Sequence, residues 1–452
     1  HTSTAFQQLS HLETAHSPIN AIVIPLFQHS TRTMSPSAIE SIQEKVDEIK
    51  TKILPSHQKT EVAETLEVKP VEEEDQAETP GIVPTKAFEI LLSEDDVLPE
   101  RLVGHKEPLK LSGALDKFES FDVTPVIGRE YANVDLVELL NAPNSDELLR
   151  DLAITISQRG VVFFRAQDNL TNDLQKQLVQ RLGQLSGKPE TSGLHIHPIS
   201  NAARALGGKD DEISVISSEQ AKQLYAKKYA DIGLTKHRQS GKTQWHSDIT
   251  FEPIPSDYAL LRLTQLPETG GDTLWASGYE LYDRISPTLR GFLDTLTGYY
   301  AQPAFNEAAK NNGFKVYSEP RGAPENVGEI LEAVHPVIRT NPVTGWKSVF
   351  AVGHHVKRIH GLSDDESKHF LDWFVQLIVE NHDLQVRYKW KAVNDVAIWD
   401  NRSVYHAATP DYIFEEGLGE RKGNRAVSLG ERPYFDPQSS SRREAIKKAR
   451  AA

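Results

Sequence analysis

The chain has 452 residues, of which 38% are hydrophobic and 25% charged, a composition typical of a water-soluble globular protein. No apolar run approaches the roughly 20 residues needed to cross a bilayer, so we expect no membrane span. The formal net charge of −14 and the lack of a long basic stripe before the C-terminal tail disfavour nucleic-acid binding, because an acidic surface repels phosphate backbones.

The sequence contains no cysteine, which excludes disulfides, thiolate metal sites and cysteine nucleophiles. Any metal must therefore be held by histidine, carboxylate or backbone oxygen, and these ligands favour a harder metal such as iron or manganese. The lack of a recognisable signal peptide favours a cytoplasmic location.

The first 80 residues are predicted to be a flexible, acidic extension. The only methionine is Met34, and residues 1–33 are either sequence upstream of the native start or part of a processed precursor. Residues 35–55 are predicted to form a polar helix, and Glu61 to Pro80 a solvated linker with no apolar period to bury. We divide the chain into the extension 1–80, a segment 81–144 that packs on the core, a catalytic domain 145–438 and a basic, helix-forming tail 439–452.

The catalytic domain is predicted to begin with a helix from Ser145, where leucines recur at helical spacing up to Gly160. The apolar run 161–164 predicts a buried strand, and a second helix follows from Thr171 to about Gly183. Further helices are predicted as inserts at 279–296 and 363–379. Beyond Gly193, short apolar runs separated by Gly, Pro and Asn predict strands at 213–216, 258–263, 273–275, 349–352, 396–399 and 425–429. This pattern predicts a mainly β protein with helices, built on a double-stranded β-helix (jelly roll).

His246 and Asp248 are the strongest candidates for metal ligands. Their spacing of two places both side chains on one face of a predicted extended strand, so both can reach a single ion. His406 follows an apolar strand and a turn, and it can supply the third ligand of a 2-His-1-carboxylate site, which holds non-haem Fe(II). A His-x-Asp pair alone is a weak signal and is more often structural.

The region from Gly160 to Phe435 resembles the taurine and alkylsulfonate dioxygenases, which are Fe(II)/2-oxoglutarate-dependent oxygenases. The segments that carry this resemblance are Leu194-His195-Ile196-His197-Pro198, Trp245-His246-Ser247-Asp248, Thr269-Gly270-Gly271-Asp272-Thr273-Leu274-Trp275, His335-Pro336-Val337, Gln385-Val386-Arg387 and Ile398-Trp399-Asp400-Asn401-Arg402.

The resemblance implies a role for each matched residue. It implies that His246, Asp248 and His406 are the iron ligands and catalytic residues, and that Thr273 and Arg421 bind 2-oxoglutarate. The residues implied for substrate binding are Arg425 and His197 on the sulfonate, with Phe251 and Phe350 as apolar wall.

Without the resemblance, other interpretations compete with these roles. Thr273 is then an ordinary strand residue, Arg425 belongs to an internal salt bridge, and the two phenylalanines belong to the core. His195 is expected to point away from His197 and to be structural.

The resemblance further implies a reaction that uses Fe(II), 2-oxoglutarate and dioxygen. The carbon next to a sulfonate, in taurine or another alkylsulfonate, is hydroxylated, which releases sulfite and an aldehyde together with succinate and CO₂, a reaction of sulfur metabolism. It also implies a homo-oligomer. The same chemistry on an alkyl sulfate, a phenoxyalkanoate or another carboxylate is the nearest alternative, and a non-catalytic jelly-roll protein that binds anions is a second. A metallohydrolase is disfavoured because no second carboxylate cluster accompanies His246 and Asp248.

Overall fold

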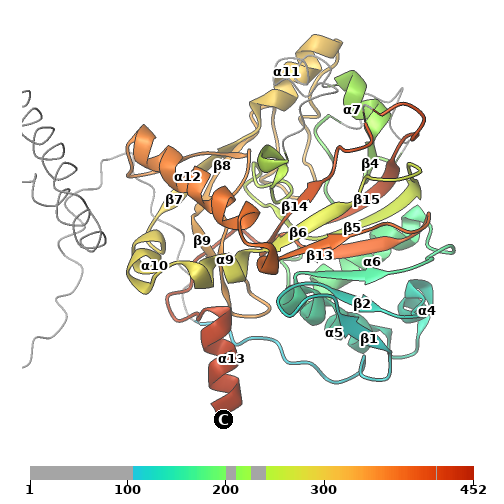
Figure 1. The fold of residues 1–452 in the computed structure, drawn as a ribbon, viewed down its shortest axis with the longest axis horizontal. Helices are drawn as coiled ribbons and strands as arrows, with labels where there is room; N and C mark the ends of the chain where they lie inside the picture. Colours follow the sequence, from blue (N-terminus) through green and yellow to red (C-terminus); the bar gives the residue numbers. More distant parts are fainter. Residues whose placement is uncertain (1–104, 200–209, 225–240, 414, 452) are drawn as a thin grey trace, which may run out of the picture. The chain divides into compact units, whose positions relative to one another are not determined.

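A seven-stranded sheet and a three-stranded sheet pack against each other and carry the site (Figure 1). The structure is a computed structural model that describes residues 105–199, 210–224, 241–413 and 415–451, all of which belong to one unit that spans residues 83–452. The extension 1–80, with the helix predicted at 35–55, lies outside the described residues.

The larger sheet has the order β1-β2-β3-β13-β5-β15-β4. All of its pairs are antiparallel except β2 with β3. Its strands are β1 (Ser120–Asp122), β2 (Arg129–Tyr131), β3 (Val161–Phe164), β13 (Val396–Asp400), β5 (Ser256–Gln265), β15 (Lys422–Leu429) and β4 (Ile213–Ser217).

The smaller sheet that faces it has the order β12-β6-β14, and two further small sheets complete the set. Its strands are β12 (Gln385–Tyr388), β6 (Thr273–Ser277) and β14 (Val404–Ala408). The other two are β11-β7-β8 and β10-β9, with strands β11 (Val356–Ile359), β7 (Thr297–Ala301), β8 (Glu332–Pro336), β10 (Lys347–Val349) and β9 (Ile338–Thr340).

Side-chain alternation along the central strands gives the larger sheet two buried faces. Val162 and Phe164 of β3 belong to one apolar cluster, whereas Val161 and Phe163 belong to another, as expected for a period of two. The first face is covered by α5 (Ser145–Arg159) and α6 (Asn172–Leu185). The second face packs on the smaller sheet, where Trp275 of β6 lies 5.7 Å from Trp399 of β13 and 5.5 Å from Phe163, measured between ring centroids.

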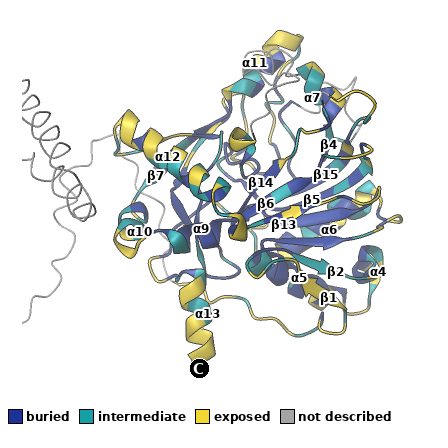
Figure 2. Ribbon diagram, viewed as in Figure 1, coloured by how far each residue is buried: buried dark blue, intermediate teal, exposed yellow. Residues whose placement is uncertain are grey.

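The remaining helices lie around these sheets (Figures 1 and 2). They are α4 (Leu136–Asn141), α7 (Ser218–Leu224), α9 (Gly278–Arg284), α10 (Pro287–Leu293), α11 (Pro303–Asn312), α12 (Asp364–Val379) and α13 (Arg442–Ala451), with 3₁₀ turns at Lys242–Gln244 and His382–Leu384. Figure 2 shows that α13 is largely exposed and that α12 is partly exposed, while the central strands are buried. None of the helices in the described ranges combines the length and apolar character that a membrane span requires.

Most predicted elements are present, with two differences. The predicted helix 279–296 is two helices, α9 and α10, because Pro287 opens the second and the residue before a proline avoids helical geometry. The predicted strand 349–352 ends at Val349. The amides of Phe350 and Ala351 both donate to the carbonyl of Val337. Two residues of one segment therefore stand opposite a single residue of the other, and the regular hydrogen-bond pattern between the strands ends there.

A buried ion pair fixes the turn between β13 and β14. Arg402 donates to both carboxylate oxygens of Asp400, at 2.8 and 2.9 Å, and their side chains are only 1% and 0% exposed. Ser157 and Asn341 donate further hydrogen bonds to Asp400. The turn is therefore rigid, and it determines where β14, and with it His406, begins.

We predict that Asp400→Asn lowers the free energy of unfolding by about 3 kcal/mol, because it removes the bidentate counter-charge of the buried Arg402 guanidinium and leaves it paired with Glu431 at 3.6 Å. Chemical denaturation measures the loss. Asp372→Asn is the matched control, because Asp372 pairs with Lys368 on the exposed face of α12 and such pairs contribute about 0–1 kcal/mol. Equal effects of the two substitutions would contradict a structural role for the Asp400–Arg402 pair.

Candidate metal centre

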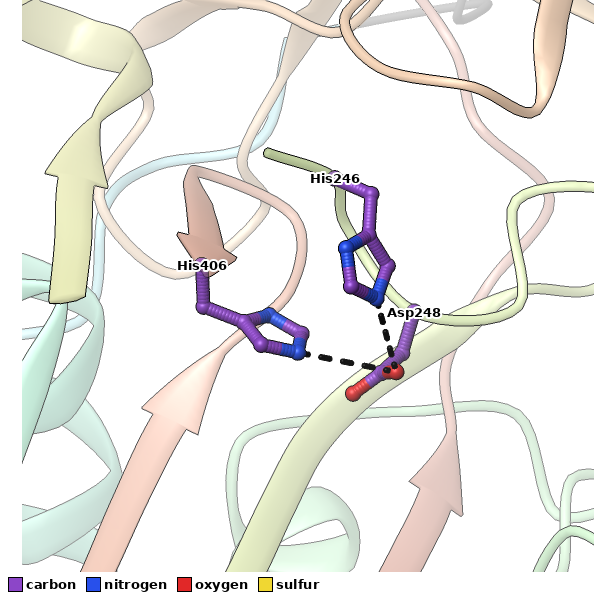
Figure 3. Close-up of side chains that lie close together, drawn as sticks. All are labelled: His246, Asp248 and His406. Carbon is purple, nitrogen blue, oxygen red and sulfur yellow. Dashed lines mark ion pairs between the residues drawn. The ribbon is translucent and has the colours of Figure 1, made fainter. Parts of the chain in front are cut away.

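The structure brings His246, Asp248 and His406 together (Figure 3). The Nε2 atoms of both histidines lie 3.9 Å from Oδ1 of Asp248. One ligand atom from each of the three residues lies within 4.8 Å of the other two, and no second group of three His, Cys, Asp or Glu side chains in the described ranges meets this condition.

The backbone of His246 meets that of His406 in a single antiparallel bridge. Each amide donates to the other residue's carbonyl, at 3.1 and 2.8 Å. The prediction that His246 and Asp248 lie on one regular strand is wrong, because Asp248 already belongs to a turn in which Ile249 has a φ of 62°. Ser247 donates to the carbonyl of Val404 at 2.6 Å, so its side chain is directed to β14 while its two neighbours face the site.

The site holds one anionic and at least one neutral ligand at neutral pH. Burial alone would raise the pKa of Asp248, but Arg425 and the neighbouring histidines outweigh it and lower the pKa to about 2. Burial lowers the pKa of His406 to about 3, despite the nearby Asp248. Asp248 is therefore ionised and His406 is neutral, the states in which both side chains bind a metal.

The donor set fits a divalent metal. Nδ1 of His246 lies 2.6 Å from the carbonyl of Gln244, so this nitrogen carries the proton and leaves the lone pair of Nε2 facing Asp248. Oδ2 of Asp248 and Nδ1 of His406 are buried and have no hydrogen-bond partner in the described part of the chain. Two imidazoles and a carboxylate, with no thiolate, suit Fe(II) or Mn(II).

Arg425, on β15, lies directly against this triad. Its NH1 atom donates to Oδ1 of Asp248 at 2.6 Å, and the residue is 9% exposed. The internal salt bridge considered from the sequence therefore exists, and its partner is a candidate metal ligand. Nε of Arg425 is buried without a partner among the described residues, so the guanidinium retains donor capacity for an anion.

His197 and Phe251 lie on one continuous aromatic wall. The ring of His197 is 5.0 Å from that of Phe305, which is 5.5 Å from that of Phe251. Loss of water, together with His195 and Arg425, lowers the pKa of His197 well below its usual value. Its Nδ1 accepts a hydrogen bond from the amide of Ile199 at 3.2 Å, which leaves the proton on Nε2.

The expectation that His195 points away from His197 is wrong. Their ring centroids are 6.2 Å apart, because alternate residues of an extended segment share a face. His195 is buried, and its Nε2 lies 3.7 Å from Oε1 of Glu252.

Arg421, which lines a pocket of about 150 Å³, contacts Thr273. Arg421 donates to the carbonyl of Gly271 at 2.9 Å and to Oγ1 of Thr273 at 3.1 Å. Trp390 also donates to Oγ1 of Thr273, at 3.1 Å. The pocket is lined by Arg421, Gln244, Ala408, Thr409 and Tyr412, among others. It therefore adjoins both segments that carry the histidines of the triad.

Phe350 lies apart from the aromatic wall that contains Phe251. Its ring packs on Tyr300 and His335 and beneath the guanidinium of Arg339. The ring of His355 packs edge-to-face against that of Phe251, with ring centroids 5.1 Å apart. His355 was not predicted from the sequence. It stands next to His354, and such an adjacent pair has no spacing that distinguishes it among the 17 histidines of the chain.

We predict that Mn(II), added anaerobically to metal-free protein at one hundred times its Kd, stabilises the fold by about 2.7 kcal/mol. Thermal denaturation with and without metal measures this difference. Asp248→Asn abolishes the metal-induced shift, whereas Asp372→Asn on α12 retains it. Stabilisation of both variants by the metal would contradict a site at the triad.

Comparisons with known proteins agree with this geometry. Residues 119–427 match the family described as "Taurine catabolism dioxygenase TauD, TfdA family". The α-ketoglutarate-dependent dioxygenase btcD of Neocamarosporium betae is 55% identical over 350 residues, which cover 75% of this chain and 98% of the relative. A putative α-ketoglutarate-dependent sulfonate dioxygenase of Schizosaccharomyces pombe is 32% identical over 304 residues, covering 67% of this chain and 68% of the relative.

A solved structure shares the fold. The putative α-ketoglutarate-dependent taurine dioxygenase from Burkholderia xenovorans matches with a TM-score of 0.51 and 26% identity, covering 72% of this chain and 93% of the other. The chain belongs to the TauD/TfdA family and is an α-ketoglutarate-dependent (2-oxoglutarate-dependent) dioxygenase.

Proposed function

We propose that this dioxygenase uses Fe(II) and 2-oxoglutarate to hydroxylate the carbon next to a sulfonate, in taurine or a longer alkylsulfonate. The products are sulfite, an aldehyde, succinate and CO₂. The observation that carries the proposal is the position of Arg425, a buried cation that touches Asp248 of the triad. A substrate anion bound by Arg425 would have its neighbouring carbon close to the metal.

His197 complements Arg425 as a receptor for the sulfonate. A neutral imidazole with its proton on Nε2 donates a hydrogen bond without adding charge, and the guanidinium supplies the permanent charge. A sulfonate stays anionic throughout the physiological pH range, so this receptor needs no proton transfer. Phe251, and Phe305 beside it, would line the apolar part of the substrate; the same role for Phe350 stays a prediction.

Arg421 and Thr273 would hold the distal carboxylate of 2-oxoglutarate. Arg421 is oriented by the Gly271 carbonyl, and Thr273 is held between Arg421 and Trp390. Both residues are at most 5% exposed, so their hydrogen bonds to a carboxylate would be made in a medium of low dielectric constant, where they are strong.

The triad of His246, Asp248 and His406 would hold Fe(II), which supplies the oxidation of the C–H bond by dioxygen. The chain's own part would be to hold the three ligands close together, to orient both anions by their arginines and to exclude water through the aromatic wall. We also propose the jelly-roll assignment of the two facing sheets, a homo-oligomer and a cytoplasmic location.

The names of several relatives favour one alternative substrate class, the sulfate esters. The relatives named for sulfonates include those of Schizosaccharomyces pombe and Saccharomyces cerevisiae, at 32% and 30% identity. A relative from Pseudomonas putida, at 28% identity, is named for sulfate esters, and the fungal dioxygenase at 55% identity bears no substrate name. Arg425 would accept a sulfate or carboxylate as well as a sulfonate.

We predict that the protein, supplied with Fe(II), 2-oxoglutarate and dioxygen, releases sulfite in step with succinate from at least one member of a panel of alkylsulfonates that includes taurine. Sulfite and succinate are quantified together, with Asp248→Asn as the inactive control. Substrate-dependent succinate from alkyl sulfates or carboxylates, with no sulfite from any sulfonate, would contradict the sulfonate assignment and leave the dioxygenase intact.

We predict that Thr273→Val raises the KM for 2-oxoglutarate about tenfold, because a hydrogen bond to a charged group contributes about 1.5 kcal/mol. Steady-state kinetics at saturating second substrate checks this. Thr264→Val on β5 is the matched control, since its hydroxyl is exposed and donates to the carbonyl of Lys422 at 3.3 Å. A KM for Thr273→Val within twofold of the control's would refute the assignment of Thr273.

A further inference from the structure

The turn that presents Asp248 is strained. Ile249 has a φ of 62°, a left-handed conformation that β-branched residues rarely adopt and that costs about 1–3 kcal/mol. Such a turn persists only where surrounding contacts hold it. Ile249 is 3% exposed, so those contacts are made inside the protein.

His355 contacts the chain on both sides of Asp248. Its Nδ1 lies 3.0 Å from the hydroxyl of Thr250. Its ring lies against those of Phe251 and His246, with centroids 5.1 and 5.8 Å away. One imidazole therefore contacts residues before and after the strained turn, and at 4% exposure it does so away from water.

The segment that carries His355 lies directly on the metal-ligand segment. Gly353 forms a backbone bridge with His246, and a Cβ at Gly353 would lie 2.4 Å from the carbonyl of Trp245. The φ of Gly353 is 97°. The chain can approach this closely, and deliver His355 to the turn, only because this residue is glycine.

Asn401 holds the same turn from the other side. Its Oδ1 accepts a hydrogen bond from the amide of Asp248 at 3.1 Å. Trp399 and Ser256 fix the orientation of the Asn401 amide, each through a hydrogen bond of 2.9 Å.

A second histidine secures the end of the turn. Nε2 of His335 lies 3.0 Å from the carbonyls of both Thr250 and Glu252, so this nitrogen carries the proton and donates to them. The backbone that follows Asp248 is thereby tied to β8, the strand that bears His335.

We propose that His355 is a positioning residue that clamps the Ser247–Thr250 turn and thereby presets Asp248 for the metal. The inference rests on the metal-binding function proposed above. Without the clamp, the turn relaxes from its strained form, and part of the binding free energy of the metal is spent on restoring it. Loss of the clamp is therefore expected to weaken metal binding directly, and to lower turnover only as a consequence of weaker metal binding.

The test is an anaerobic titration of metal-free protein with Mn(II), followed by the electron paramagnetic resonance signal of the free ion. We expect His355→Phe, which keeps a ring but removes the hydrogen bond to Thr250, to weaken metal binding by roughly tenfold to a hundredfold. Thr250→Val removes only the hydroxyl partner and should act in the same direction. Because both changes break one contact, the double variant should lose less than the product of the single effects.

His360→Phe is the matched control. Nδ1 of His360 lies 2.9 Å from the hydroxyl of Thr297, an equivalent His–Thr contact in the β7–β11 region. We expect this control to retain the wild-type Kd for Mn(II), even where its thermal midpoint falls as far as that of His355→Phe. A purely structural role for His355 would change the midpoint without changing the Kd.

Three outcomes would overturn the inference. Wild-type affinity in both His355→Phe and Thr250→Val would show that the clamp is not needed. A change confined to the KM of the organic substrate would make His355 a residue of the substrate wall. Failure of the wild-type protein to bind Mn(II) would remove the metal site itself and the inference with it, and this result is distinguishable because it does not depend on any variant.

Discussion

The buried carboxylate of Asp248 is the constraint on which the rest of the site depends. An ionised group at 4% exposure is tolerated only if other charges compensate it, and Arg425 does so at 2.6 Å while two imidazoles approach from other directions. The same arrangement leaves a second oxygen of Asp248 without a protein partner among the described residues. A divalent cation would compensate the part of the negative charge of Asp248 that the surrounding protein groups leave uncompensated.

The fold serves this site by bringing distant segments into register. β13 and β14 are joined by a turn that the Asp400–Arg402 pair locks, so His406 has a fixed starting point. A single backbone bridge then holds His246 opposite His406. Arg421, which directly precedes β15, donates to Thr273, and Arg425 on β15 donates to Asp248. One segment of the chain thus contributes to the proposed sites of both organic substrates.

Local pattern predicted most of the elements, such as the apolar run of β3, because each depends on neighbours in the sequence. The triad needed more than the spacing of His246 and Asp248, because its third member, His406, is distant in the sequence and was assigned through the family resemblance. The Arg425–Asp248 contact joins residues far apart in the chain and left no local signal. His355 reaches the turn only through the close approach at Gly353, which no residue pattern predicts. The ring of Phe350 packs on Tyr300 and His335, contacts between distant residues that no local pattern indicates, and its role on the substrate wall stays a prediction.

The central claim is that the triad binds one Fe(II) ion to which 2-oxoglutarate adds. Its most direct test is an anaerobic absorption titration of the metal-free protein with Fe(II) and 2-oxoglutarate. We expect a weak visible charge-transfer band that requires both components, saturates at one Fe(II) per chain and is absent from the Asp248→Asn variant. The same band in that variant, or no band in the wild-type protein at saturating concentrations, would contradict binding of Fe(II) and 2-oxoglutarate at the triad.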